Sequence, residues 1–153
     1  AKVLAAKDLA NDEIAVLLQE PKLSDPFCAN GVKEVADRLY QAKQKKEKVL
    51  VCGDYDADGI CATAIMVDAL RSYGIDCGFY IPNRFSEGYG LHENTVGLAK
   101  QKGYALLITV DNGVKAKTAL SFAHTMGIDV IVTDHHSMDE EVTCLQLVHH
   151  LRH

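Results

Sequence analysis

Apolar residues along the chain form short continuous runs that alternate with stretches of helical periodicity. The runs cover residues 48–53, 76–81, 105–110 and 128–133. They lack the polar alternation of a half-exposed strand, which is typical of strands buried on both faces. Between them, the apolar spacing predicts helices over residues 59–73, 92–102 and 115–126. This order predicts an α/β fold with an open, mainly parallel sheet and helices on both faces.

Residues 1–47 have a different pattern and form a helical lead-in to the strands. Residues 12–19 predict a short amphipathic helix that ends before Pro21 and Pro26. A second helix is predicted over residues 31–46, with its apolar positions on one face. The basic run KQKKEK at its end is explained better by a solvated helix end than by a nucleic-acid patch.

Composition places the chain among globular, core-forming domains. It has 153 residues, of which 48% are hydrophobic and 24% charged, and no apolar run approaches the length of a membrane span. The five cysteines lack CxxC spacing and the first residues lack the pattern of a secretory signal, so we expect a cytoplasmic protein. The net charge of -5 argues against nucleic-acid binding through general basicity.

Polar clusters follow the four predicted strands at the points where the strands end. They are DYDADG at residues 54–59, PNRFSEGYG at 82–90, DNG at 111–113 and DHH at 134–136. The carboxyl ends of parallel strands share one edge of the sheet, where open α/β folds bind their ligands. We therefore expect four segments that are distant in sequence to converge on one site.

The side chains in these clusters indicate a metal site. Its candidate residues are Asp54, Asp56, Asp58, Asp111, Asp134, His135 and His136. Crowded carboxylates repel one another unless a cation or protons intervene. Mixed carboxylate and imidazole ligands suit Mn²⁺, Fe²⁺, Co²⁺ or Zn²⁺ better than Ca²⁺. A carboxylate shared by two ions would make a two-metal site, which activates water for phosphoryl displacement.

Two other acidic sites explain the pattern less well. DYDADG matches the start of an EF-hand loop, but Ile65 stands at the position where that loop requires a bidentate glutamate. A phospho-receiver domain also gathers aspartates at strand ends, but it has no use for paired histidines.

The negative charge of the chain is concentrated in the motif aspartates. Removing these five from the 21 acidic residues leaves 16, equal to the 16 basic residues, so the excess charge lies in the expected metal site.

The loop at residues 82–90 supplies what an acidic site lacks. Arg84 can bind a phosphate through two hydrogen bonds, and Gly88 and Gly90 let backbone N–H groups approach an anion. For Tyr89, stacking on a base and packing in the fold are alternative roles. His92 is interpreted as a cap of the following helix.

Other reactive side chains are interpreted as structural. Cys52 and Cys61 flank the first aspartates and are interpreted as core thiols, with Cys52 facing the first loop. The histidines near the C-terminus are interpreted as part of a frayed tail. They are His149, His150 and His153.

Four segments resemble the motifs of the DHH phosphoesterase superfamily. They are GDYDADG, PNRFSEGYGL, VDNGV and TDHH, in this order. RFSEGYGL is similar to the RecJ branch, whose members are 5′-to-3′ exonucleases specific for single-stranded DNA. The resemblance implies a pair of Mn²⁺ or Mg²⁺ ions held by Asp56, Asp58, Asp111 and His135, and the convergence of acids adds Asp54 as a further candidate ligand.

The resemblance also implies roles in catalysis. His136 would lie beside the scissile phosphate, where it stabilises charge or a ligand, and Asp134 would orient the histidines. Together with Asp111 they form the candidate catalytic set. In the pyrophosphatase branch a histidine ligand stands at the position of Cys52, so the cysteine argues against that branch.

The resemblance divides the chain into three parts. They are the helical lead-in at residues 1–47, a DHH phosphoesterase core at 48–136, and a tail at 137–153 that is truncated or non-native. The family carries a further metal-binding aspartate and a substrate-binding DHHA1 domain downstream, and we expect neither in this chain.

The expected function is hydrolysis of single-stranded DNA from its 5′ end in DNA repair and recombination, alongside other proteins of these processes and away from membranes. One alternative is a DHH phosphodiesterase that acts on oligoribonucleotides or cyclic dinucleotides. The other is a truncated, inactive module that binds metal or nucleic acid. The choice between Mn²⁺ and Mg²⁺ and the oligomeric state stay open.

Overall fold

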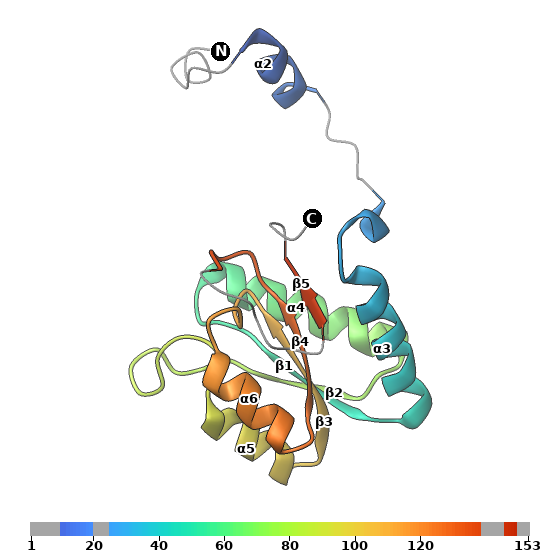
Figure 1. Cartoon of the computed structure of the whole chain (residues 1–153), viewed down its shortest axis with the longest axis vertical. Coiled ribbons are helices and arrows are strands. Elements are labelled where there is room, and N and C mark those ends of the chain that lie inside the picture. The colour runs from blue at the N-terminus through green and yellow to red at the C-terminus, as the bar shows by residue number, and fades with distance from the viewer. Residues whose placement is uncertain (1–9, 20–24, 139–145, 150–153) are drawn as a thin grey trace.

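A five-stranded sheet forms the centre of the computed structural model, which describes residues 10–19, 25–138 and 146–149. The strand order is β2-β1-β3-β4-β5, and all neighbouring strands are parallel (Figure 1). The strands are β1 (Lys48–Cys52), β2 (Cys77–Tyr80), β3 (Tyr104–Val110), β4 (Asp129–Thr133) and β5 (Gln146–Val148). The prediction of an open parallel sheet is confirmed.

Helices cover both faces of the sheet, as predicted. The helices are α2 (Asn11–Leu17), α3 (Val32–Lys45), α4 (Ala57–Tyr73), α5 (Glu93–Gln101) and α6 (Lys117–Thr125), with a short 3-10 helix, η1 (Pro26–Cys28), before α3. Buried residues of α3 and α4 share one core cluster with the strands, and those of α5 and α6 share another. Figure 1 shows α5 and α6 side by side.

The alternation of side chains along each strand explains the continuous apolar runs. In β1, Val49 and Val51 belong to the core cluster of α3 and α4, whereas Leu50 and Cys52 belong to that of α5 and α6. All four side chains are buried. Because both faces of β1 are covered, the sequence shows no polar position between its apolar residues.

The strands pair regularly at the edge where the polar clusters begin. Cys52 pairs with Thr109, and Val110 pairs with Thr133. The register of β1 against β3 shifts between Lys48 and Val49, at the opposite end of β1. The irregularity in the pairing of β1 with β3 therefore lies away from the edge that carries the polar clusters.

The lead-in and the C-terminal segment differ in how well they were predicted. The two predicted lead-in helices correspond to α2 and α3. The strand β5 was not predicted, and it extends the sheet by pairing with β4. It lies after residue 136, where we expected the core domain to end. That domain boundary stays a prediction. Among the residues that the structure describes, none of the helices has the length and apolar character needed to cross a membrane.

Candidate metal centre

The loops that follow β1, β2, β3 and β4 meet at the carboxyl edge of the sheet. Nε2 of His135 lies 2.8 Å from Oδ1 of Asp111 and 3.7 Å from Oδ2 of Asp58, which joins the segments that follow β1, β3 and β4. From the loop after β2, the hydroxyl group of Tyr89 donates a hydrogen bond of 2.9 Å to the carbonyl oxygen of Asp111. The expected convergence of four distant segments is confirmed by these contacts.

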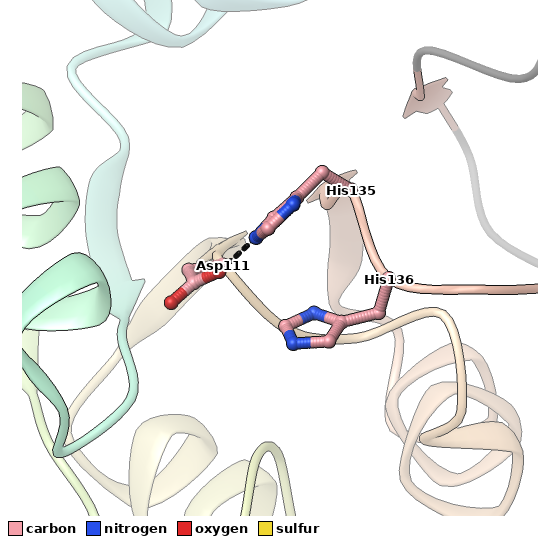
Figure 2. A group of neighbouring side chains, drawn as sticks. All are labelled: Asp111, His135 and His136. Carbon is pink, nitrogen blue, oxygen red and sulfur yellow. Dashed lines mark hydrogen bonds and ion pairs between the residues drawn. The ribbon is translucent and has the colours of Figure 1, made fainter. Parts of the chain in front are cut away.

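Asp111, His135 and His136 form a group that can hold a metal ion. Each offers one ligand atom, and these atoms all lie within 4.8 Å of one another (Figure 2). Asp111 is buried, whereas the side chain of His135 is 61% exposed, so the group opens to solvent. The structure thus places His136, which was expected beside the phosphate, among the atoms that could bind metal.

The three aspartates after β1 have different surroundings. Asp58 lies in the first turn of α4 with its carboxylate exposed near His135. Asp56 caps α4, because its Oδ1 accepts a hydrogen bond of 2.9 Å from the backbone N–H of Gly59. Asp54 is only 1% exposed, and its Oδ1 has no hydrogen-bond partner among the described residues. The ligand roles of all three stay predictions.

The turn after β3 holds Asp111 in an uncommon backbone conformation. Asp111 has a φ of 60°, in the left-handed region that only a few residue types tolerate. The buried side chain of Asn112 donates hydrogen bonds to the carbonyl oxygens of Cys52, at 3.0 Å, and Val110, at 2.9 Å, so it ties β1 to β3. At Gly113, where φ is 118°, a Cβ atom would collide with the side chain of Thr109. Each residue of DNG therefore has a separate structural task.

Asp134 organises the backbone of the DHH segment. Its Oδ1 accepts hydrogen bonds from the backbone N–H groups of His135, at 2.7 Å, and His136, at 3.1 Å, and its Oδ2 accepts one of 3.0 Å from Val114. Burial alone would raise the pKa of Asp134, but the backbone hydrogen bonds lower it below its ordinary value. An ionised Asp134 agrees with the expected orienting role, which stays a prediction.

Tyr89 connects the loop after β2 to both His136 and Asp111. Its hydroxyl oxygen lies 3.2 Å from Nδ1 of His136, which also bonds Oδ1 of Asp134 at 2.7 Å. Burial raises the pKa of Tyr89, and the charges of Asp134 and Asp111 raise it further, so the phenol keeps its proton for the bond to Asp111. Sequence reasoning left this role unrecognised, because a tyrosine beside glycines carries no signal for a backbone partner in another loop.

The loop at residues 82–90, called the glycine loop below, has two glycines with positive φ, but its phosphate-binding role stays a prediction. Gly88 and Gly90 have φ angles of 83° and 80°, which favour glycine. The guanidinium carbon of Arg84 lies 5.4 Å from the centre of the Tyr55 ring, so the cation stacks on the segment that carries the first aspartates. A pocket of about 530 Å³ lies beside His136 and includes Tyr89 and Lys115 in its lining.

Several structural interpretations need correction. His92 occupies the N-cap position of α5, as predicted, although its side chain makes no capping hydrogen bond. Cys61 is exposed on α4, so it is not a core thiol. Cys52 is a core thiol, and burial raises its pKa to about 12. Its side chain packs in the cluster of α5 and α6 rather than facing the first loop, since side chains alternate along β1.

The prediction of a frayed tail is wrong for His149. This residue follows β5 and is 4% exposed, and its Nε2 lies 2.6 Å from the carbonyl oxygen of His136. The pairing of β5 with β4, which was not predicted, brings it there. His150 and His153 lie outside the described residues.

Solved structures of known proteins match the fold of this chain. A crystal structure of exonuclease RecJ bound to manganese matches 84% of this chain and 33% of its own chain, with a TM-score of 0.76 and 36% identity. RecJ of Thermus thermophilus in complex with Mn²⁺ matches 84% of this chain and 18% of its own, with a TM-score of 0.70 and 32% identity.

Sequences of known proteins also match this chain, and these again include RecJ exonucleases. The single-stranded-DNA-specific exonuclease RecJ of Bacillus subtilis is 43% identical over 126 residues, which are 82% of this chain and 16% of the relative. RecJ of Escherichia coli is 43% identical over 108 residues, which are 70% of this chain and 19% of the relative. The chain thus spans less than a fifth of the length of these two relatives. Residues 48–152 match the N-terminal domain of the DHH family, and the chain belongs to that family.

Proposed function

We propose that this chain carries the metal-binding part of the active site of a RecJ-type exonuclease, which hydrolyses single-stranded DNA from its 5′ end with a pair of Mn²⁺ or Mg²⁺ ions. The observation that carries the proposal is the group of Asp111, His135 and His136 beside Asp58. Relatives named as single-stranded-DNA-specific exonucleases support the substrate, and a RecJ structure bound to manganese supports the metal. We assign the activity to DNA repair and recombination in the cytoplasm, alongside other proteins of these processes.

The residues present fit a divalent cation. Burial raises the pKa of Asp111, the hydrogen bond with His135 lowers it, and the charges of Asp58 and Asp56 raise it, with a net increase. The buried Oδ1 of Asp54 is also left without a partner among the described residues. A cation would offset both the repulsion and the uncompensated burial. Carboxylate and imidazole donors together suit Mn²⁺.

The chain's own residues would divide the work of binding and orientation. The ions would be held by Asp56, Asp58, Asp111 and His135, with Asp54 as a further candidate. When bound, they supply an activated water and neutralise charge on the phosphate. His136 would steady the scissile phosphate, and Asp134 would fix the orientation of both histidines through the hydrogen bonds to their backbone N–H groups. The phosphate oxygens would be bound by Arg84, Gly88 and Gly90.

The test measures Mn²⁺ binding by isothermal titration calorimetry and the release of mononucleotides from a 5′-phosphorylated single-stranded oligonucleotide. It compares the unchanged chain with Asp111→Asn and with Asp68→Asn. Asp68 is a matched control, because it is an exposed carboxylate about 15 Å further along α4 than Asp58. We expect the unchanged chain and Asp68→Asn to bind Mn²⁺ and release mononucleotides, and Asp111→Asn to lose both.

Three other outcomes would contradict parts of the proposal. Cleavage of a dinucleotide with intact DNA would favour a phosphodiesterase of small substrates. Mn²⁺ binding without turnover of either substrate would favour an inactive metal-binding module. If the unchanged chain and Asp111→Asn bound Mn²⁺ equally well, the metal would bind somewhere other than at the group of Asp111, His135 and His136.

A further inference from the structure

The strand β5 brings a further strand end to the edge that carries the metal centre. Val148 pairs with Thr133, and the carbonyl oxygen of Val148 accepts a hydrogen bond of 3.3 Å from the backbone N–H of Asp134. The pairing of β4 with β5 therefore continues to the first residue of the DHH segment. His149 comes next along the chain, beside the backbone that carries His135 and His136.

The imidazole of His149 is held in the interior by a defined hydrogen bond. It is buried, and its Nε2 lies 2.6 Å from the carbonyl oxygen of His136. Because a carbonyl oxygen can only accept, the ring must carry a proton on Nε2. Replacing His149 with an apolar residue would leave the carbonyl oxygen of His136 without this donor.

This hydrogen bond and Asp134 hold the backbone of His136 from both ends of the residue. The N–H group of His136 donates to Oδ1 of Asp134 at 3.1 Å, and its carbonyl oxygen accepts from His149. The directions in which the imidazoles of His135 and His136 point follow from the rotation of this short segment. Fixing both peptide groups of His136 therefore restricts where the ligand atoms can lie.

We infer that His149 is a positioning residue of the metal centre, which acts through the carbonyl oxygen of His136 to keep the two imidazoles where metal and phosphate bind. The roles of these imidazoles rest on the proposed function, whereas the hydrogen bond that positions them does not. His149 itself touches neither the proposed metal nor the substrate. Groups that hydrogen-bond metal-ligating side chains change metal affinity by about 10- to 100-fold when they are replaced, and the low end of this range is expected for a group that acts through the backbone.

The test compares two replacements of His149 with a change elsewhere in β5. His149→Leu removes the donor, whereas His149→Gln keeps an N–H group at a similar reach. Leu147→Ala is the matched control, since Leu147 is a buried neighbour in β5 whose side chain has no polar group to donate. Each variant of the full chain is measured for thermal stability, for Mn²⁺ affinity by calorimetry, and for the backbone amide resonance of Ser137, which shares its peptide group with the carbonyl of His136.

We expect His149→Leu to lower Mn²⁺ affinity about tenfold and to shift the Ser137 amide resonance, and His149→Gln to restore most of both. Leu147→Ala should lower thermal stability but change Mn²⁺ affinity by less than about twofold. The inference is overturned by unchanged affinity in His149→Leu, by failure of His149→Gln to restore it, or by an equal loss in Leu147→Ala.

A separate measurement keeps this inference distinct from the proposed function. The ¹⁵N resonances of the His149 ring in the metal-free chain should show a proton on Nε2, and an unprotonated Nε2 would overturn the inference. If the unchanged chain binds no Mn²⁺, the proposed function fails. In that case the ring resonances, and the response of Ser137 to the two His149 variants, still decide whether the hydrogen bond holds the DHH segment.

Discussion

The hydroxyl group of Tyr89 donates a hydrogen bond of 2.9 Å to the carbonyl oxygen of Asp111, so the glycine loop is fixed to the turn that presents the central carboxylate. The bond joins two loops that leave different strands, β2 and β3. A substitution in the glycine loop should therefore change the Mn²⁺ affinity of the metal centre, even where no side chain of that loop binds metal.

Replacing Tyr89 by phenylalanine tests this connection. Tyr89→Phe removes the donor to Asp111 and should lower the free energy of unfolding by about 0.5–1.5 kcal/mol, with a several-fold loss of Mn²⁺ affinity. Urea unfolding and calorimetry measure the two effects. Tyr40→Phe, at an exposed position of α3, is the control and should change neither. Equal behaviour of the two variants would show that the Tyr89 hydroxyl contributes to neither.

Gly113→Ala and Gly97→Ala should have opposite effects on stability. At Gly113, a Cβ atom would meet the side chains of Thr109 and Val132 at a φ of 118°, so we expect a loss of about 2 kcal/mol or more. At Gly97, inside α5, no atom lies within 4 Å of a Cβ, so alanine should raise stability by up to about 1 kcal/mol. Thermal and urea unfolding measure both, and a neutral Gly113→Ala would contradict the tight packing of this turn.

Removing the charge of Asp111 should separate stability from metal binding. Its raised pKa means that ionisation costs more in the folded chain than in the unfolded chain. At neutral pH without metal, Asp111→Asn should therefore keep or raise the melting temperature. The same variant should lose the increase in melting temperature that Mn²⁺ gives the unchanged chain. Melting curves in EDTA and in Mn²⁺ measure this, and a large loss of stability in EDTA would contradict the expected cost of the buried charge.

Thiol labelling should distinguish the cysteines of the folded chain. Burial raises the pKa of Cys52 to about 12, so at pH 8 it carries almost no thiolate and should react only after unfolding. Cys28 and Cys61 are exposed and should react at once. The measurement is mass spectrometry of peptides after brief alkylation, with Cys144→Ser to remove the cysteine outside the described residues. Rapid labelling of Cys52 would show that β1 opens.

The elements that could be predicted are those whose burial in the fold is visible in the local pattern of apolar residues. Strands such as β1 and β4 are buried on both faces, so their sequences are apolar without interruption. The convergence of the site followed from topology alone, because each polar cluster begins where a parallel strand ends. These two regularities predict that Asp58, Asp111 and His135 lie close together, as the distances between them show.

The part that could not be predicted depends on pairings between distant segments. β5 has only three residues, and a run this short has no period that distinguishes it from a loop. Without β5, His149 could only be interpreted as part of a tail. Asn112 was equally hidden, since Asn-Gly is common turn chemistry, whereas its side chain reaches the carbonyl oxygen of Cys52 in another strand.

The shift in register between β1 and β3 lies at Lys48 and Val49, away from the metal centre. We therefore expect a change in chain length at that far edge to leave unaltered the pairs that precede the ligands, such as Cys52 with Thr109. The turn at Gly103 lies between α5 and the start of β3, and its Cβ position faces open space. For protein engineering, we expect a label or an affinity peptide at this edge to disturb the metal centre less than one at the opposite edge, where the candidate ligands lie.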